Sequence, residues 1–540
     1  MAVYVATVVY IGRDTTLFVD EVDLFTVSDG LDPESLLAPL NGHLELLLRL
    51  AYAGLFGLVG ADDFTPIQLL HALGAILAAA VFFALVKERL GPAAALPLTL
   101  LLLFLGSAWE ITFIESGFTH VWCLAAGLAA LLALERDDRR GEVAACVLLV
   151  AAISAFTYGI AFAIGAGVLI WRRGRGRRAL WVALVPLALY AAWLVWVRAV
   201  YVPEHGEAQT FELANLLVVP NFVANEAAAV AGALTGLDYP FGVEGIDSVF
   251  GTSSIYGPLL ALLAAGALAL RLRRGEVSPF LWAAIALLLA VWCALALGYG
   301  PGRNPTTVRY VYAGSALAML VGAEAARQRR LSRTAVLAIF AVCALALAGN
   351  IARLRDGAAY YRTHSLEFRA ELTAIEIARD QVAPDFLPDA SGTLIGFPAL
   401  PAEEYFDAVA RNGSPAFTEN ALLDQGEGVQ AAVDEALIRA LGLELAPAAD
   451  DATRADCRSF VGGSPATVRI APAGVSVRSA SGGAVSLARF AQGTSSPVGE
   501  LVPGRRAELE LPADESEVAW RMVLSSPGGE VEICPLPEGS

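Results

Sequence analysis

The chain has 540 residues, of which 56% are hydrophobic and 17% charged, with a net charge of −17 and a mean hydropathy of +0.59. These values exclude an ordinary soluble globular protein and predict an α-helical polytopic membrane protein. Residues 351–540 hold 28 acidic and 15 basic side chains, so most of the negative charge lies in a water-exposed C-terminal region. Nucleic acid is excluded as a partner, because phosphate binding needs a basic face.

Residues 1–11 are apolar but reach only about half of the ~20 residues that span a bilayer. We interpret them as the remains of a first spanning helix. Ten further apolar stretches bring the predicted total to about 11 transmembrane helices. These stretches are 66–86, 92–108, 117–134, 143–157, 159–171, 179–200, 256–270, 279–298, 308–325 and 334–350.

Arginine-rich connections follow several of these stretches, and the positive-inside rule places them on the cytoplasmic side. This assignment requires that residues 44–60 form an interfacial helix and that 143–171 form a hairpin turning at Thr157-Tyr158-Gly159. Residues 222–237 are predicted to be a second interfacial or re-entrant helix. The resulting topology is a multi-pass protein of a bacterial plasma membrane, with a cytoplasmic N-terminus, an exocytoplasmic C-terminal region and the long loops outside.

Asp20, Glu21 and Asp23 open the first polar segment, directly after the hydrophobic N-terminus. Carboxylates here face water, a headgroup or a substrate, because a charge in hydrocarbon costs several kcal/mol. The adjacent carboxylates Asp20 and Glu21 suit the role of a general base that deprotonates an acceptor hydroxyl. The alternative is a solvated turn that ends the first helix.

Short motifs accompany this acidic segment. They are Pro39-Leu40-Asn41-Gly42-His43, Trp109-Glu110, Gly159-Ile160-Ala161-Phe162, Tyr405-Phe406 and Gly413-Ser414-Pro415-Ala416. The arrangement resembles the GT-C superfamily of integral membrane glycosyltransferases, and within it an actinobacterial-type group related to enzymes that use polyprenyl-phosphate sugars. The resemblance implies that Asp20 and Glu21 are catalytic, with Glu110 as a second acidic position. Asp23, Asn41 and His43 are candidate substrate-binding residues.

Arg303, Arg309 and Tyr310 lie in an outer connection, against the positive-inside pattern. An arginine fork suits a phosphate, so these residues are candidates to hold the phosphate of a lipid-linked donor. The alternative is snorkelling or pairing with a loop carboxylate. Histidines 43, 71 and 120 lack metal-ligand spacing. No metal site or certain cofactor is therefore predicted, although a divalent cation is left open.

The C-terminal region divides in two. Residues 360–445 have a helical pattern, whereas Cys457 and Cys534 bracket short β-like runs separated by Gly, Pro and Ser. These runs predict a small β-sandwich, and the cysteine pair suggests a disulfide in an oxidising compartment. The predicted domains are a transmembrane GT-C-like domain (1–350), an exocytoplasmic helical region (351–450) and a β-sandwich-like domain (451–540).

The leading hypothesis is a membrane glycosyltransferase of cell-envelope assembly. It would transfer a sugar from a polyprenyl-phosphate donor to an exocytoplasmic glycan, lipid or protein acceptor. A transporter or flippase of a lipid-linked or anionic substrate is one alternative, although neither inverted repeats nor interrupted helices are evident. A non-catalytic envelope scaffold that presents the β-domain is the other.

Overall fold

The computed structural model describes two compact units. The helical unit comprises Met1–Arg13, Ser28–Leu58 and Phe64–Arg362, and the tail unit comprises Asp14–Val27, Val59–Asp63 and Thr363–Ser540. The residues described are 1–27, 31–114, 117–174, 177–200, 213–238, 251, 254–299, 304–327, 331–388, 399–448, 456–462, 465–513, 516–525 and 528–537.

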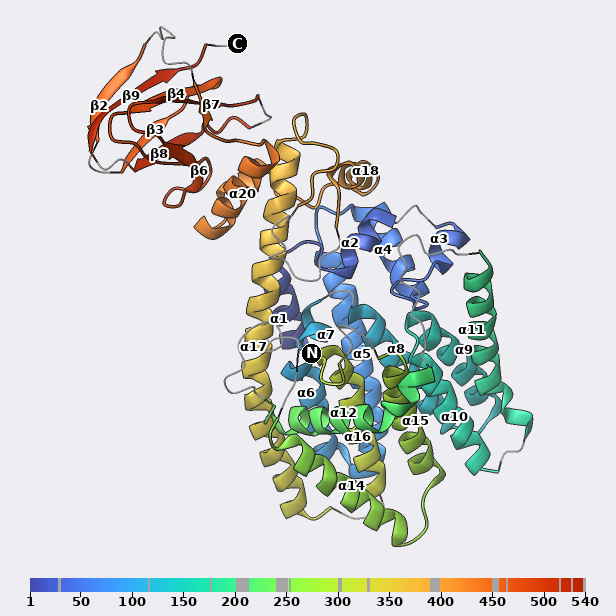
Figure 1. Cartoon of the computed structure of the whole chain (residues 1–540). Helices are drawn as coiled ribbons and strands as arrows, with labels where there is room; N and C mark the ends of the chain where they lie inside the picture. The colour runs from blue at the N-terminus through green and yellow to red at the C-terminus, as the bar shows by residue number, and fades with distance from the viewer. Residues whose placement is uncertain are drawn as a thin grey trace. The chain divides into compact units, whose positions relative to one another are not determined.

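The helical unit is built from α-helices (Figure 1), most of which are apolar in sequence. They are α1 (Ala2–Gly12), α3 (Pro33–Leu37), α4 (Leu46–Val59), α5 (Thr65–Leu90), α6 (Pro92–Leu103), α7 (Trp109–Phe113), α8 (Phe118–Leu134), α9 (Arg139–Ala155), α10 (Gly159–Arg172), α11 (Trp181–Val200), α12 (Val219–Thr235), α14 (Gly257–Arg273), α15 (Pro279–Leu297), α16 (Val308–Ala326) and the first part of α17 (Arg333–Ile377).

Four of these helices, α5, α11, α15 and α17, are long and apolar enough to cross a membrane. A fifth span results if α6 and the segment Gly106–Phe113, bent by 41° at their break, count as one. The protein is therefore a multi-pass helical membrane protein. Other predicted spans are shorter apolar helices, such as the 17-residue α8 and the 14-residue α10, so the total of about 11 remains a prediction.

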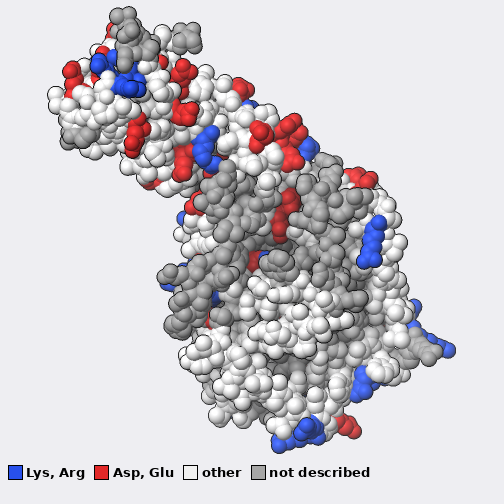
Figure 2. Space-filling view, viewed as in Figure 1, with Lys and Arg blue, Asp and Glu red and all other residues white. Residues whose placement is uncertain are grey.

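A buried ion-pair network joins several helix ends of this unit. The Arg89 guanidinium lies 2.5 Å from Glu324 and 2.6 Å from Glu135, and Ser278 donates to Glu324 at 2.6 Å. Such pairing offsets the large cost of burying a charge. Arg89 belongs to Lys87-Glu88-Arg89, one of the arginine-rich connections that the positive-inside rule places on the cytoplasmic side. On the face drawn in Figure 2, the surface of the helical unit is mostly uncharged, with basic groups near its edge.

The tail unit includes a segment from near the N-terminus. The segment Asp14–Val27, which contains α2 (Asp20–Val27), groups with the end of α17 and with α18 (Ala402–Asn412), α19 (Glu419–Leu423) and α20 (Glu427–Ala440). Helix α17 runs without a break past Asn350, where the sequence suggested a domain boundary. The acidic segment thus belongs by its contacts to the tail unit.

The predicted small β region is present as two antiparallel sheets (Figure 1). One has the strand order β1-β7-β4-β9-β2 and the other β3-β8-β5-β6. Val477 and Leu509 of the first sheet share a core with Leu487 and Met522 of the second. The strands are β1 (Ala446–Pro447), β2 (Arg458–Gly462), β3 (Ala466–Arg469), β4 (Gly474–Ser479), β5 (Gly483–Ala488), β6 (Ser496–Leu501), β7 (Arg506–Glu510), β8 (Arg521–Ser525) and β9 (Gly529–Pro535).

Helix α20 is fastened to this β region through two carboxylates. Asp434 accepts hydrogen bonds from the backbone N–H groups of Arg489, Phe490 and Ala491 at 2.8–3.1 Å. Glu427, seven residues earlier, accepts from the N–H groups of residues 492, 493 and 494 at 2.7–3.1 Å. Six successive backbone donors therefore find acceptors on one helix, which satisfies groups that β5 leaves unpaired where it ends.

Glu427→Gln is expected to lower the melting temperature at neutral pH but not in acid. The N–H groups of Gln492 and Gly493 hold the pKa of the exposed Glu427 carboxylate below its ordinary value of 4.5. Its contribution to stability is therefore present above that value and is lost as the pH falls through the folded-state pKa. Scanning calorimetry of both proteins between pH 7 and pH 3 tests this. A difference in melting temperature that stays the same from pH 7 to pH 3 would contradict this prediction.

Candidate functional site

Asp20, Glu21 and Asp23 of the acidic segment Asp14–Val27, which belongs to the tail unit, differ in how exposed they are. Glu21 is fully buried, which corrects the expectation that all these carboxylates face water, a headgroup or a substrate. Its Oε2 accepts a hydrogen bond from the backbone N–H of Phe18 at 2.9 Å. Asp20 and Asp23 are partly exposed. Glu21 thus stabilises the start of α2, where a helix favours negative charge, and Asp20 is the better placed of the adjacent pair to meet a substrate.

Directly before this pair, Val19 has a φ of +50°. A β-branched residue rarely takes this left-handed conformation, and holding it costs about 1–3 kcal/mol. The surroundings must therefore fix the backbone firmly. Backbone strain of this kind clusters at functional sites, so the conformation of Val19 supports Asp20, the next residue, as a candidate site residue.

In the helical unit, Glu110 and Arg309 form an ion pair. Arg309 Nη1 of α16 donates to Glu110 Oε1 of α7 at 2.8 Å, and their side chains are 36% and 12% exposed. The guanidinium also lies over the Tyr310 ring, 5.5 Å from its centroid. Within the described parts of the chain, Glu110 Oε2 has no hydrogen-bond partner. Arg309 is thus charged, oriented and still partly accessible.

The helix α7 that carries Glu110 is fixed by its neighbours. Trp109 is fully buried and packs on Gly357 of α17, where the lack of a Cβ leaves room for the indole. Asn350 Oδ1 accepts from both the backbone N–H and the hydroxyl of Ser107 at 3.1 and 3.0 Å. These contacts hold the Glu110 carboxylate at a set position opposite Arg309.

The motif Pro39-Leu40-Asn41-Gly42-His43 forms a tight turn in the helical unit. Leu40 and His43 exchange both backbone hydrogen bonds, and Asn41 and Gly42 have φ values of +49° and +76°, as a type I′ turn requires. Asn and Gly are the residues that tolerate these angles. The turn presents His43, whose Nδ1 lies 2.8 Å from Thr157 Oγ1.

Aromatic residues connect His43 with His120. Both imidazoles pack on Phe156, with centroids 4.6 and 4.4 Å away, and the Tyr158 hydroxyl donates to the His120 carbonyl at 2.8 Å. His43, His120 and Thr157 thus form one polar cluster in the helical unit.

The predicted site residues therefore fall into two groups. Glu110, Asn41, His43, Arg309 and Tyr310 belong to the helical unit, and Asp20, Glu21 and Asp23 to the tail unit. Arg303 lies outside the described residues. Sequence reasoning missed Thr157 and Tyr158 as polar partners of the histidines. Their position in the polar break between two apolar stretches was the available signal.

A cavity of about 380 Å³ lies near this cluster, between α9, α11 and the loop before α4. Its wall is mostly apolar and includes Leu44, Ile153, Tyr190 and Trp193. Leu44 of this wall directly follows His43 in the chain. The apolar cavity and the polar cluster therefore lie next to one another at this point.

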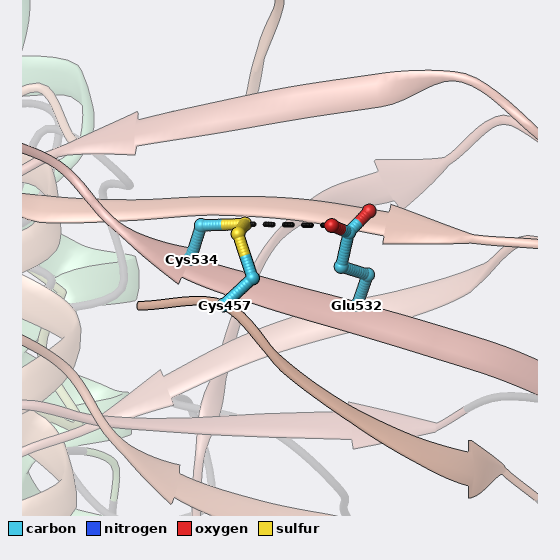
Figure 3. Close-up of side chains that lie close together, drawn as sticks. All are labelled: Cys457, Glu532 and Cys534. Carbon is cyan, nitrogen blue, oxygen red and sulfur yellow. Dashed lines mark hydrogen bonds between the residues drawn. A yellow bond between two sulfur atoms is a disulfide. The ribbon is translucent and has the colours of Figure 1, made fainter. Parts of the chain in front are cut away.

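Cys457 and Cys534 form a disulfide that joins residues 77 positions apart (Figure 3). Glu532 Oε1 lies 3.8 Å from Cys534 Sγ. The three side chains form the one close group of metal-ligating residue types among the described residues. Both thiols are consumed by the disulfide, so this group does not offer the thiolates that would bind a metal ion.

Two crystal structures of ArnT from Cupriavidus metallidurans are similar to this chain. The structure bound to undecaprenyl phosphate has 15% identity and a TM-score of 0.41, with 76% of this chain and 87% of that chain covered. The structure in the apo state has 14% identity and a TM-score of 0.41, with coverages of 77% and 89%. No protein-family model and no curated protein matches the sequence. Function must therefore be argued from this chain's own residues.

Proposed function

We propose that the protein is a GT-C-type membrane glycosyltransferase that transfers a sugar from a polyprenyl-phosphate donor to an exocytoplasmic acceptor, with inversion. The observation that carries the proposal is the Glu110–Arg309 pair, a partly exposed guanidinium held by a carboxylate in an apolar helical unit. Such a guanidinium suits a phosphate next to a lipid chain. The resemblance of the acidic segment to GT-C enzymes supports the same reaction.

In this reaction a carboxylate, Asp20 or Glu21, takes the proton of the acceptor hydroxyl. The acceptor oxygen forms a bond to the anomeric carbon, and the bond from that carbon to the phosphate oxygen breaks. The phosphate leaves with the electron pair, and Arg309 stabilises its charge, with Glu110 orienting the guanidinium. Arg303 and Tyr310 would assist at the phosphate, and Asp23, Asn41 and His43 would contact the sugar or the acceptor.

The proposed setting is a bacterial plasma membrane, with a cytoplasmic N-terminus and an exocytoplasmic C-terminal region. The disulfide Cys457–Cys534 supports an oxidising compartment for the tail. The domain division of the proposal is a transmembrane part, a helical region and a β-sandwich-like domain.

The experiment that tests the function uses purified, full-length protein and a panel of polyprenyl-phosphate sugars. Arg309→Ala is expected to raise the KM for the donor about 10- to 100-fold, because a hydrogen bond to a charged group is worth about 1.5–3 kcal/mol. Arg273→Ala, which removes an exposed arginine of α14, serves as the matched control. No turnover with any donor would refute the glycosyltransferase, and an unchanged KM would refute the role of Arg309.

A further inference from the structure

We propose that Ser365, Arg369 and Asn412 clamp both ends of the acidic segment Asp14–Val27 and thereby position Asp20 and Glu21. The proposal rests on the proposed function for its catalytic meaning, because only there do these carboxylates act on a substrate. All the contacts that carry it lie within the tail unit. It assigns a role to the motifs at 405–406 and 413–416, which the reaction itself leaves unused.

The N-terminal end of the segment is held by α17. The Ser365 hydroxyl accepts from the backbone N–H of Thr16 at 2.9 Å and donates to the Thr16 carbonyl at 3.1 Å. Both residues are buried. This hydroxyl therefore satisfies the two backbone groups of one residue, as a neighbouring β-strand would.

Arg369 ties the same end to the Gly413-Ser414-Pro415-Ala416 motif. Its Nη1 donates to the Asp14 carbonyl at 2.9 Å and its Nη2 to the Ala416 carbonyl at 3.1 Å. The guanidinium also lies over the Phe417 ring, 4.1 Å from the centroid. The Thr16 hydroxyl donates to the Pro415 carbonyl at 3.3 Å. One arginine thus bridges two segments about 400 residues apart in sequence.

The C-terminal end of the segment is held by α18. The Asn412 side-chain amide donates to the Phe25 carbonyl at 2.9 Å, and Arg411 donates to the Thr26 carbonyl at 2.6 Å. These carbonyls belong to the last turn of α2, where no further helical N–H groups are available to them. Asn412 itself is fixed through its own carbonyl, which accepts from Ala61 N–H at 2.7 Å.

The elements behind the clamp are linked to one another by the Glu376 carboxylate. Glu376 Oε1 accepts from the Tyr405 hydroxyl and from the Ser414 hydroxyl, each at 2.6 Å. The buried Tyr405 ring then packs against Phe25 of α2, with centroids 6.2 Å apart. One carboxylate therefore links α17, α18 and the 413–416 motif behind the acidic segment.

Between the two anchored ends lies the unfavourable φ of Val19. A backbone in a sparsely populated conformation persists only where its surroundings over-determine it. The clamp supplies this constraint from both sides. It sets the direction in which α2 starts, and hence where the Asp20 carboxylate points.

The first arm of the test is amide hydrogen exchange of the full-length protein. Ser365→Ala and Asn412→Ala are each expected to speed exchange of residues 14–27 by about tenfold, because local opening becomes easier. The control Thr418→Ala removes an exposed side-chain hydrogen bond to a backbone N–H at the start of α19 and should leave exchange of residues 14–27 unchanged. Unchanged exchange in both clamp variants, or equal effects of the control, would overturn the clamp whether or not the protein transfers sugar.

The second arm measures transfer with the donor that the wild-type protein uses. Loss of the clamp is expected to lower kcat about tenfold with little change in the donor KM, and Ser365→Thr, which retains a hydroxyl, should restore kcat. Faster exchange with an unchanged kcat would overturn the positioning role. Absence of transfer in the wild type would refute the proposed function, while the exchange arm would still decide whether the clamp exists.

Discussion

Asp20→Asn is expected to lower kcat for sugar transfer by about 10²–10⁴-fold, the usual contribution of a general base. Asparagine has nearly the same shape as aspartate but cannot take a proton. Asp20 is partly exposed at the first residue of α2, so the substitution leaves no buried group without a partner. The melting temperature should therefore stay close to that of the wild type, which separates loss of chemistry from loss of fold.

Glu21→Gln is the matched comparison. Glutamine keeps an oxygen for the Phe18 N–H, the bond that Glu21 makes in the structure, so transfer should fall much less than in Asp20→Asn. Glu21→Ala would instead remove this acceptor and destabilise the start of α2. Turnover and thermal unfolding of the three variants decide the assignment. If Asp20→Asn and Glu21→Gln both transfer sugar at the wild-type rate, neither carboxylate is the base.

Features that depend on local sequence could be predicted. Apolar stretches gave most of the helices, and Gly, Pro and Ser between short runs gave the β region, because periodicity and turn residues act over a few positions. The break at Thr157-Tyr158-Gly159 between α9 and α10 follows the same logic. The Asn41-Gly42 pair carried a further local signal that the sequence analysis did not use, since Asn and Gly favour the angles of a type I′ turn.

Features that depend on distant residues could not be predicted. Glu110 and Arg309 are 199 positions apart. Both were singled out, and pairing of the arginine with a loop carboxylate was one of the alternatives, but nothing in the sequence identified Glu110 as the partner. Thr16 and Ser365 are 349 positions apart, so the grouping of the acidic segment with the tail emerged only from the structure. The φ of Val19 is set by tertiary contacts against the preference of valine.

Asp434→Ala is expected to lower the free energy of unfolding of the tail unit by at least about 3 kcal/mol, because three backbone N–H groups lose their acceptor and an unsatisfied buried donor costs about 1–3 kcal/mol. Asp434 is nearly fully buried, so water cannot readily replace the carboxylate. The lower free energy of unfolding should be visible by amide hydrogen exchange in urea, because the amides of residues 458–537 should exchange at a lower urea concentration than in the wild type. The effect should exceed that of Glu427→Gln, whose carboxylate is exposed.

The pH dependence at Asp434 has the opposite sign to that at Glu427. Burial raises the pKa of Asp434 above its ordinary value of 3.8, against the opposing effect of its backbone hydrogen bonds. The folded state therefore holds a proton more tightly than the unfolded state, and this contribution to stability is full below 3.8 and is lost as the pH rises through the folded pKa. Asp434→Asn keeps one oxygen acceptor and carries no buried charge. It should therefore lower the free energy of unfolding of the tail unit less than Asp434→Ala does. A loss with Asp434→Asn equal to that with Asp434→Ala at neutral pH would show that both carboxylate oxygens, and not the single acceptor, fasten α20 to the β region.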